Sequence, residues 1–170
     1  FDYSYVLTVS ETMRKRLAMV GAPNDRSKCA YIGVLLENFY YKRRVTLQNK
    51  YKRGEDISFL QVSNFVEKKG HKYTLLAFSK LLEFYPHARL TLAGNGYLQI
   101  EMKNYVSELG ISHAVDFVGH KNTIDVIKLM ENSDCFLHHS VTASDGDQEG
   151  IPTVLMEAMA TGLPVISTFH

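Results

Sequence analysis

The residues of this chain best suited to chemistry are two glutamates on either side of a glycine–proline turn. Glu149 and Glu157 belong to the run EGIPTVLMEAMATG, in which Pro152 fits the first position of a helix because its missing N–H costs nothing there. Glu149 precedes this helix, where a carboxylate accepts hydrogen bonds from sugar hydroxyls. Glu157 lies about a turn and a half inside it, where its two oxygens can accept from a ribose diol. A lone glutamate in such a helix is usually solvated, and the pairing with the turn argues against that explanation.

The backbone of the same turn is suited to an anion. The N–H groups of Ile151, Thr153 and Val154 would point outward without intrahelical partners, and the positive end of the helix dipole lies behind them. The turn therefore predicts a site for a diphosphate.

Two lysines before another predicted helix give a second, weaker anion signal. Lys68 and Lys69 precede Gly70 and the amphipathic run HKYTLLAFSKLLEFYP. An ammonium group beside a helix N-terminus attracts the same anion as the free N–H groups. Two solvated lysines on a turn are the alternative explanation.

Two further loops carry glycines next to polar side chains. In AGNGYLQ, Gly94 and Gly96 flank Asn95 and would let the backbone approach a ligand closely. The dinucleotide fingerprint needs another glycine where this chain has Gln99, which disfavours a nicotinamide cofactor. In GHKN, His120 or Lys121 could border a bound base, although a loop histidine is more often only solvated.

Strands alternate with amphipathic helices along most of the chain, which predicts an α/β fold: a Rossmann-like parallel sheet with helices on both faces. Ligands of such sheets bind in the crevice at the carboxyl ends of the strands, so the polar loops that carry these residues are expected to meet there. The predicted strands are 57–63, 88–94, 114–119, 134–140 and 163–168, and the predicted helices are 71–86, 97–110, 123–133 and 152–162.

The first third predicts a strand at 5–10, a helix at 11–20 and a strand at 28–34. A basic stretch with interspersed tyrosines comes next, and such a stretch could bind RNA or a membrane surface. We favour an ordinary linker, because the stretch lacks a clear period. Its basic residues are Lys42, Arg43, Arg44, Lys50, Lys52 and Arg53.

The composition excludes several classes of function. With 170 residues, 45% of them hydrophobic, the chain can form a domain with a real core, and its net charge of +1 gives no general argument for nucleic acid as a partner. The distant Cys29 and Cys135 predict buried reduced thiols in a cytoplasmic protein. A zinc site of His138 or His139 with acidic residues such as Asp145 lacks good spacing, so no metal is expected. No run is apolar enough to span a bilayer, and both ends suggest a domain cut from a longer protein.

This assembly resembles the retaining group-1 glycosyltransferases, whose GT-B fold has two facing Rossmann-like domains. The resemblance covers nearly the whole chain, because its segments follow in the family's order. The most specific part is the spacing of Glu149 and Glu157. The segments are VSETMRKRL, YIGVLLENF, VSNFVEKKGHKYTLLAF, LTLAGNGYL, VDFVGH and SVTASDGDQEGIPTVLMEAMATGLPVIST.

The resemblance implies a role for each matching position. Glu149 would contact the transferred sugar, Glu157 the ribose, and Lys69 the departing diphosphate; Glu149 and Lys69 are the expected catalytic residues. Where the family usually has Gly-Arg, this chain has Ser63-Asn64, which leaves Lys69 and the helix dipole to stabilise the leaving group. The other expected donor contacts are Asn64, Gly94, Asn95, Gly96, Gly119, His120, Gly150, Ile151, Pro152 and Thr153.

The resemblance also implies a division of the chain and a reaction. Residues 1–33 would end the acceptor domain and cross over, and 34–170 would form a nucleotide-sugar-binding domain, truncated at its C-terminal end. The reaction would be retaining transfer of a hexose from a UDP or GDP sugar to an acceptor hydroxyl, without metal or other cofactor, in cell-envelope polysaccharide or glycolipid synthesis. The acceptor, a sugar or a lipid-linked glycan, would bind the other domain, so the fragment alone is expected to be inactive. The whole protein is expected in the cytoplasm, with peripheral association with the inner face of the membrane.

Two other functions fit the same architecture. A nucleotide-sugar 2-epimerase would need acid and base residues that the sequence does not reveal. A catalytically dead sugar-nucleotide-binding module is suggested by Asn64 in place of the arginine.

Overall fold

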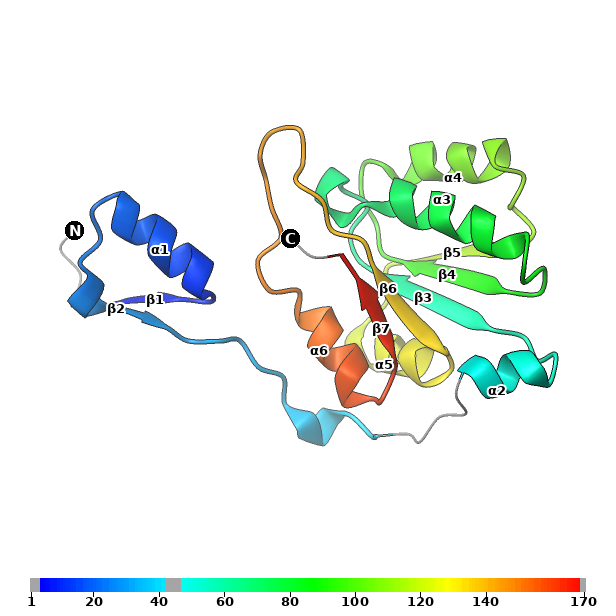
Figure 1. The fold of residues 1–170 in the computed structure, drawn as a ribbon, viewed down its shortest axis with the longest axis horizontal. Helices are drawn as coiled ribbons and strands as arrows, with labels where there is room; N and C mark the ends of the chain where they lie inside the picture. The colour runs from blue at the N-terminus through cyan, green and yellow to red at the C-terminus, as the bar shows by residue number, and fades with distance from the viewer. Residues whose placement is uncertain (1–3, 42–46, 169–170) are drawn as a thin grey trace.

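The computed structural model describes residues 4–41 and 47–168 and contains two parallel sheets (Figure 1). The first is small: β1 (Val6–Thr8) pairs with β2 (Ser27–Cys29), and α1 (Glu11–Met19) connects them. Ser10 caps α1, its hydroxyl accepting from Met13 N at 3.1 Å, as the sequence predicts. The strand predicted at 28–34 ends at Cys29, because the facing strand β1 ends at Thr8.

The second sheet has the strand order β5-β4-β3-β6-β7, and every pair in it is parallel. The structure thus confirms the predicted parallel sheet, with helix ends within a few residues of their predicted places. The strands are β3 (Ser58–Val62), β4 (Arg89–Ala93), β5 (Val115–Gly119), β6 (Cys135–His138) and β7 (Val165–Ser167). The helices between them are α3 (His71–Leu82), α4 (Gln99–Glu108), α5 (Thr123–Glu131) and α6 (Thr153–Ala160).

Helices cover both faces of this sheet (Figure 1). On one face, Phe59 and Leu90 pack with Leu75 and Phe78 of α3, and with Met102 of α4. On the other face the buried core is smaller, and it joins strands to α5 and α6 through Leu60, Met130, Phe136, Ala158 and Leu163. Burial on both faces is clearest in the central strand β3, where the consecutive residues Phe59, Leu60 and Gln61 are all buried.

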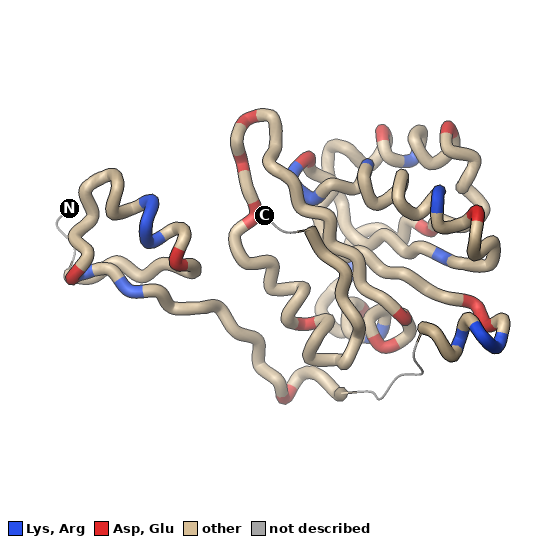
Figure 2. Tube along the Cα trace, in the orientation of Figure 1, with Lys and Arg blue, Asp and Glu red and all other residues tan. Residues whose placement is uncertain are grey.

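The described part of the basic stretch contains a short helix where the sequence suggested a linker. In α2 (Leu47–Lys52), Lys50 pairs with Asp134 at 2.7 Å, and Asp134 also accepts from the N–H of Ser58 at 2.9 Å. Burial alone would raise the pKa of Asp134, but these hydrogen bonds and the charge of Lys50 hold it below its ordinary value. Lys50 therefore anchors α2 to the sheet, and the basic residues of this segment are visible in Figure 2. Lys42, Arg43 and Arg44 lie outside the described residues.

Three 3₁₀ turns lie between the larger elements of the described residues, the first being η1 (Asn24–Arg26), between α1 and β2. The turn η2 (Leu36–Asn38) lies in the extended segment between the two sheets, and η3 (Glu67–Lys69) joins β3 to α3. The boundary expected at residue 33 falls in this extended segment and stays a prediction.

Candidate functional site

The loops that the sequence singled out leave the carboxyl ends of parallel strands, so they lie along one edge of the large sheet. Lys69 follows β3, Gly94 follows β4, and Gly119 ends β5. The long connection from β6 to α6 contains Glu149; we refer to residues 139–152 as the polar loop.

The two residues expected to be catalytic meet directly. The ammonium group of Lys69 donates to Oε2 of Glu149, and their side chains are only 16% and 12% exposed. His138, at the end of β6 and fully buried, places its Nε2 3.8 Å from the same carboxylate oxygen. This geometry brings together residues 80 positions apart at the carboxyl ends of the strands.

Glu149 is held ionised. Burial would raise its pKa, but the hydrogen bond and charge of Lys69, then the charges of His138 and Lys68, hold the pKa below its ordinary value. A charged carboxylate is an acceptor only, which suits it to hydroxyl groups of a ligand.

Two neighbours of Lys69 also contact the polar loop. The Glu67 carboxylate accepts from the N–H of Ser144 at 2.9 Å and from its hydroxyl at 2.7 Å. Lys68 pairs with Asp147 at 2.8 Å. The side chains of three consecutive residues of η3 therefore each bind one residue of the polar loop, whose acidic residues are visible in Figure 2.

A buried polar cluster supports η3 from the sheet side. The amide of Gln61, a fully buried side chain of β3, donates to the Lys69 carbonyl at 3.0 Å and to the Ser63 hydroxyl at 3.2 Å. The Ser63 hydroxyl also lies 3.2 Å from Nε2 of His71, whose ring stacks on Phe65 with centroids 4.2 Å apart. Ser63, where the resemblance expects glycine, is thus integrated into the structure beneath Lys69.

His71 makes the fold sensitive to acid. Burial, then the charges of His138 and Lys69, lowers its pKa from 6.5 to about 4. The unfolded chain binds a proton near pH 6.5 and the folded chain only near pH 4, so the folded state loses stability as the pH falls between these values. We expect the free energy of unfolding to fall by about 3 kcal/mol across that window.

Urea unfolding between pH 7 and pH 4.5 measures this effect. His71→Gln keeps a polar side chain but cannot titrate, so its stability should vary less with pH than that of the wild type. His87→Gln, which removes an exposed histidine, should keep the wild-type dependence. Parallel pH profiles for the wild type and His71→Gln would contradict the assignment.

The glycine loop after β4 packs against the loop after β3. A Cβ atom at Gly94, with φ of 142°, would lie 2.0 Å from the Ser63 carbonyl oxygen, and one at Gly96 would lie 2.4 Å from that of Phe65. The N–H of Phe65 donates to the Asn95 carbonyl at 2.9 Å. The sequence suggested that these glycines let the backbone approach a ligand closely. In the structure they let the loop after β4 approach the loop after β3.

The other expected donor contacts are more open. Asn64 and His120 are exposed, and Gly119 lies beside Asn95. The Gly119 carbonyl accepts from the N–H of Gly94 at 2.9 Å, so the loops after β3, β4 and β5 form one connected rim. Asn64, which stands where the resemblance expects arginine, is on that rim.

Pro152 is one residue earlier in the helix than predicted. It occupies the N-cap of α6, with φ of −70° and ψ of 107°, and its carbonyl accepts from Leu155 N at 3.1 Å. The helix begins at Thr153, so its free N–H groups still lie next to Gly150 and Ile151. The helix end expected to bind an anion therefore starts one position later than predicted, and its role in anion binding stays a prediction.

Glu157 lies apart from the Lys69–Glu149 pair. Together with Thr153 and Thr123 it lines a hollow of about 270 Å³, whose other wall is the segment from Gly33 to Phe39. Burial raises the pKa of Glu157. Glu157 therefore lies beside the segment that joins the two sheets, and its expected role as a ribose ligand stays a prediction.

Several residues of this site escape sequence reasoning. The sequence suggests His138 only as a metal ligand, and it does not single out Gln61, His71 or Ser144. For Gln61 and His138 the available signal is a position near the carboxyl end of a strand, where ligands of parallel sheets bind. The partners of these residues are distant in sequence and leave no local pattern.

Two other findings concern metals and thiols. Across residues 4–41 and 47–168, no group of three or more His, Cys, Asp or Glu side chains is placed to hold a metal ion; Asp147 and Glu149 pair with lysines. Both cysteines are free. Cys135 is buried, which raises its pKa to about 11, whereas Cys29 is only partly buried, so the prediction of two buried thiols was wrong for Cys29.

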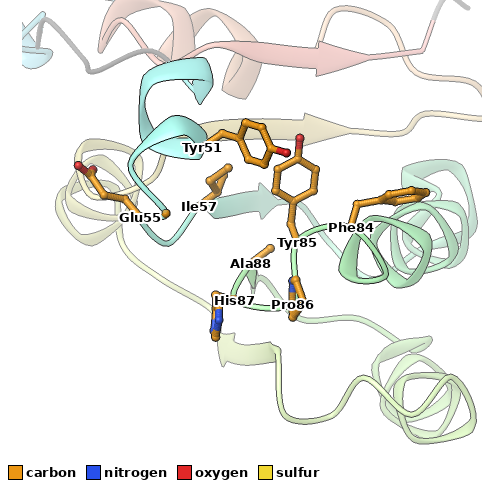
Figure 3. Close-up of a pocket in the computed structure, with 9 residues that line it drawn as sticks. Tyr51, Glu55, Ile57, Phe84, Tyr85, Pro86, His87 and Ala88 are labelled. Atoms are coloured by element: carbon orange, nitrogen blue, oxygen red, sulfur yellow. The ribbon is translucent and has the colours of Figure 1, made fainter.

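A separate hollow of about 140 Å³ lies at the opposite edge of the sheet (Figure 3). Ile57 and Ala88, just before β3 and β4, line it together with Tyr51 and Tyr85, whose rings meet edge to face at 5.1 Å. Because it faces the amino ends of the strands, it does not belong to the site. In the part of the chain that the structure describes, no helix is long and apolar enough to cross a bilayer.

Comparisons with known proteins show the family and the fold of the chain. The profile of the family described as Glycosyl transferases group 1 matches residues 43–170. The amylovoran biosynthesis glycosyltransferase AmsK of Erwinia amylovora is 32% identical over 165 residues, 97% of this chain and 39% of that protein. A GDP-mannose-dependent monoacylated alpha-(1-6)-phosphatidylinositol monomannoside mannosyltransferase of Corynebacterium glutamicum is 29% identical over 106 residues, 62% of this chain and 27% of that protein.

A solved structure shows the same fold. The crystal structure of HepE of Anabaena in complex with UDP and glucose superposes with a TM-score of 0.77 at 22% identity, covering 96% of this chain and 44% of that one. This chain spans less than half the length of each of these proteins. The chain belongs to the group 1 glycosyl transferases, and it has the architecture of the C-terminal half of their GT-B fold.

Proposed function

We propose that this chain binds a nucleoside-diphosphate sugar, of UDP or GDP type, between η3, the polar loop and the start of α6. In the whole protein this site would support retaining transfer of a hexose to an acceptor hydroxyl. The observation that carries the proposal is the Lys69–Glu149 pair at the strand ends. A cation for the diphosphate and a carboxylate for the sugar hydroxyls stand side by side there, next to a helix N-terminus.

The proposed chemistry needs charge dispersal more than proton transfer. As the bond from the anomeric carbon to the diphosphate breaks, negative charge grows on the phosphate oxygens. Lys69 and the free N–H groups at the start of α6 are fixed charges and dipoles that stabilise this developing charge, which lowers the barrier. The residues require no metal for this role.

The names of relatives support a setting for the reaction. AmsK is named for amylovoran biosynthesis, the mannosyltransferase is named for a phosphatidylinositol monomannoside, and HepE was crystallised with UDP and glucose. We place the whole protein in cell-envelope polysaccharide or glycolipid synthesis, in the cytoplasm and peripherally at the membrane. The acceptor, a sugar or a lipid-linked glycan, would bind outside residues 34–170.

A nucleotide panel tests the donor class. We expect UDP or GDP, and the corresponding sugar nucleotide, to raise the melting temperature of the chain, since a ligand that binds only the folded state stabilises it. At a ligand concentration of about 100 times Kd, the gain is about 2.7 kcal/mol. NAD serves as the control, because Gln99 interrupts the dinucleotide fingerprint. Stabilisation by NAD, or by no nucleotide at millimolar concentration, would refute the proposal.

A further inference from the structure

The contacts of Glu67 and Lys68 with the polar loop have no part in the proposed chemistry, yet they lie next to the Lys69–Glu149 pair in the chain. We propose that Glu67–Ser144 and Lys68–Asp147 form a clasp that positions Glu149 for the donor sugar. Ser144 and Asp147 are then positioning residues that determine how well the site recognises the sugar. The inference rests on the proposed function and deepens it.

The clasp joins two segments that are far apart in sequence. Glu67 receives two hydrogen bonds from Ser144, at 2.9 and 2.7 Å, across a separation of 77 residues. Lys68 holds Asp147 at 2.8 Å, and the Lys68 carbonyl accepts from Val141 N at 3.0 Å. The polar loop is therefore attached to η3 before, within and after its tip.

The tip of the loop is braced by its own hydrogen bonds. Ala143 N donates to the Asp147 carbonyl at 2.8 Å, and Gly146 N donates to the Ala143 carbonyl at 2.9 Å. The N–H of Asp147 donates to the Asp145 carboxylate at 2.9 Å. Residues 143–147 thus form a compact turn, and a shift of Asp147 is passed along the chain to Glu149 two residues later.

The clasp adds little to the stability of the fold. The side chains of Lys68 and Asp147 are 26% and 52% exposed, and exposed ion pairs contribute little because solvent screens them. The effect of the clasp is geometric instead. A displacement of a ligand-binding group by about 1 Å can cost a large part of its contribution.

The two halves of the donor would respond differently to loss of the clasp. Lys69 is fixed from below, since its carbonyl accepts from the buried amide of Gln61 at 3.0 Å. Glu149 lies on the polar loop, whose contacts with the side chains of Glu67 and Lys68 are those of the clasp. Opening the clasp should therefore disturb the sugar contact and leave the diphosphate contact in place.

The test compares nucleotides with sugar nucleotides by NMR titration of the 170-residue chain, a method suited to weak binding. The probes are UDP with UDP-glucose and GDP with GDP-mannose. We expect Ser144→Ala combined with Asp147→Asn to weaken binding of the sugar nucleotide about three- to tenfold, with the affinity for the plain nucleotide within about twofold. Each single substitution should have a smaller effect of the same kind.

Two variants serve as controls. Asp147→Glu keeps the negative charge that pairs with Lys68. Its affinity for the sugar nucleotide should therefore be closer to that of the wild type than the affinity of Asp147→Asn. Asp125→Asn removes a carboxylate from an exposed pair with Lys128, outside the site, and should leave both affinities unchanged. The melting temperatures of the unliganded variants show whether each is folded, and Ser144→Ala alone is the mildest form of the test.

The possible outcomes separate the two proposals. Equal loss of nucleotide and sugar-nucleotide binding would mean that the clasp is a general support of the fold, and would overturn the inference. Unchanged affinities in the double variant would overturn it as well, while the proposed function stands. A wild-type chain that binds none of the probes would refute the proposed function, and the inference with it.

Discussion

Replacing Lys69 by methionine is expected to lower the rate of glycosyl transfer by the intact enzyme on the order of 10³-fold, or about 4 kcal/mol in activation free energy. Lys69 is the cation that directly faces Glu149, and its side chain is largely shielded from water. In such a place a fixed charge stabilises the departing diphosphate far more than it would in bulk solvent. Because Asn64 stands where the resemblance expects arginine, Lys69 should carry more of this role.

Steady-state kinetics with the donor varied measure the effect, and it should fall mainly on kcat. Lys128→Met removes an exposed lysine of α5 and should leave the rate unchanged. Loss of Lys69 also leaves Glu149 without its cation, so the combined Lys69→Met and Glu149→Gln variant checks whether the protein remains stable. A decrease of less than tenfold in the folded single variant would argue against a role in the chemical step.

Glu149→Gln is expected to affect nucleotide and sugar nucleotide in opposite directions. In the structure the ammonium group of Lys69 is hydrogen-bonded to the Glu149 carboxylate. A diphosphate must displace this carboxylate before the ammonium group can bind phosphate oxygens. Removing the negative charge frees Lys69, and UDP or GDP alone should bind more tightly, by up to about fivefold. The sugar nucleotide loses its charged hydrogen-bond acceptor, and transfer by the intact enzyme should fall on the order of 10²-fold.

Calorimetric titration with plain nucleotide and rate measurements with the sugar nucleotide give the two signs independently. Asp116→Asn, which neutralises an exposed carboxylate of β5, should change neither quantity. If Glu149→Gln weakens binding of the plain nucleotide, then Lys69 and Glu149 do not exchange partners when the donor binds. In that case the pair would be a fixed structural contact.

The strands and helices of the large sheet could be predicted because each depends on local signals. Buried parallel strands appear as apolar runs, and Asn122 caps α5 through the N–H of Asp125, as its residue type favours. The position of the site followed from the order of these elements. Lys69 and Glu149 stood out because they lie next to predicted helix starts, whereas their catalytic roles come from the resemblance and stay predictions.

Tertiary contacts could not be predicted in the same way. The helix α2 is too short to be stable alone, and the pair of Lys50 with Asp134, 84 residues away, fixes it. The strand predicted at 28–34 was too long, because in the described residues β2 pairs only with β1 and ends opposite the last residue of β1. Gly94 and Gly96 suggested a ligand for the same reason. The sequence does not reveal that a Cβ atom at either glycine would lie within 2.4 Å of a carbonyl oxygen in the loop after β3.

The strand order has a consequence for the origin of the two central residues. From β3 the chain winds outward through β4 to β5, then returns to the middle and winds the opposite way through β6 to β7. The reversal lies between β3 and β6, and the connections leaving these two strands run to opposite faces (Figure 1). Lys69 comes from one of these connections and Glu149 from the other. The pair therefore spans the topological switch point of the sheet, where diverging loops open a crevice in any doubly wound fold.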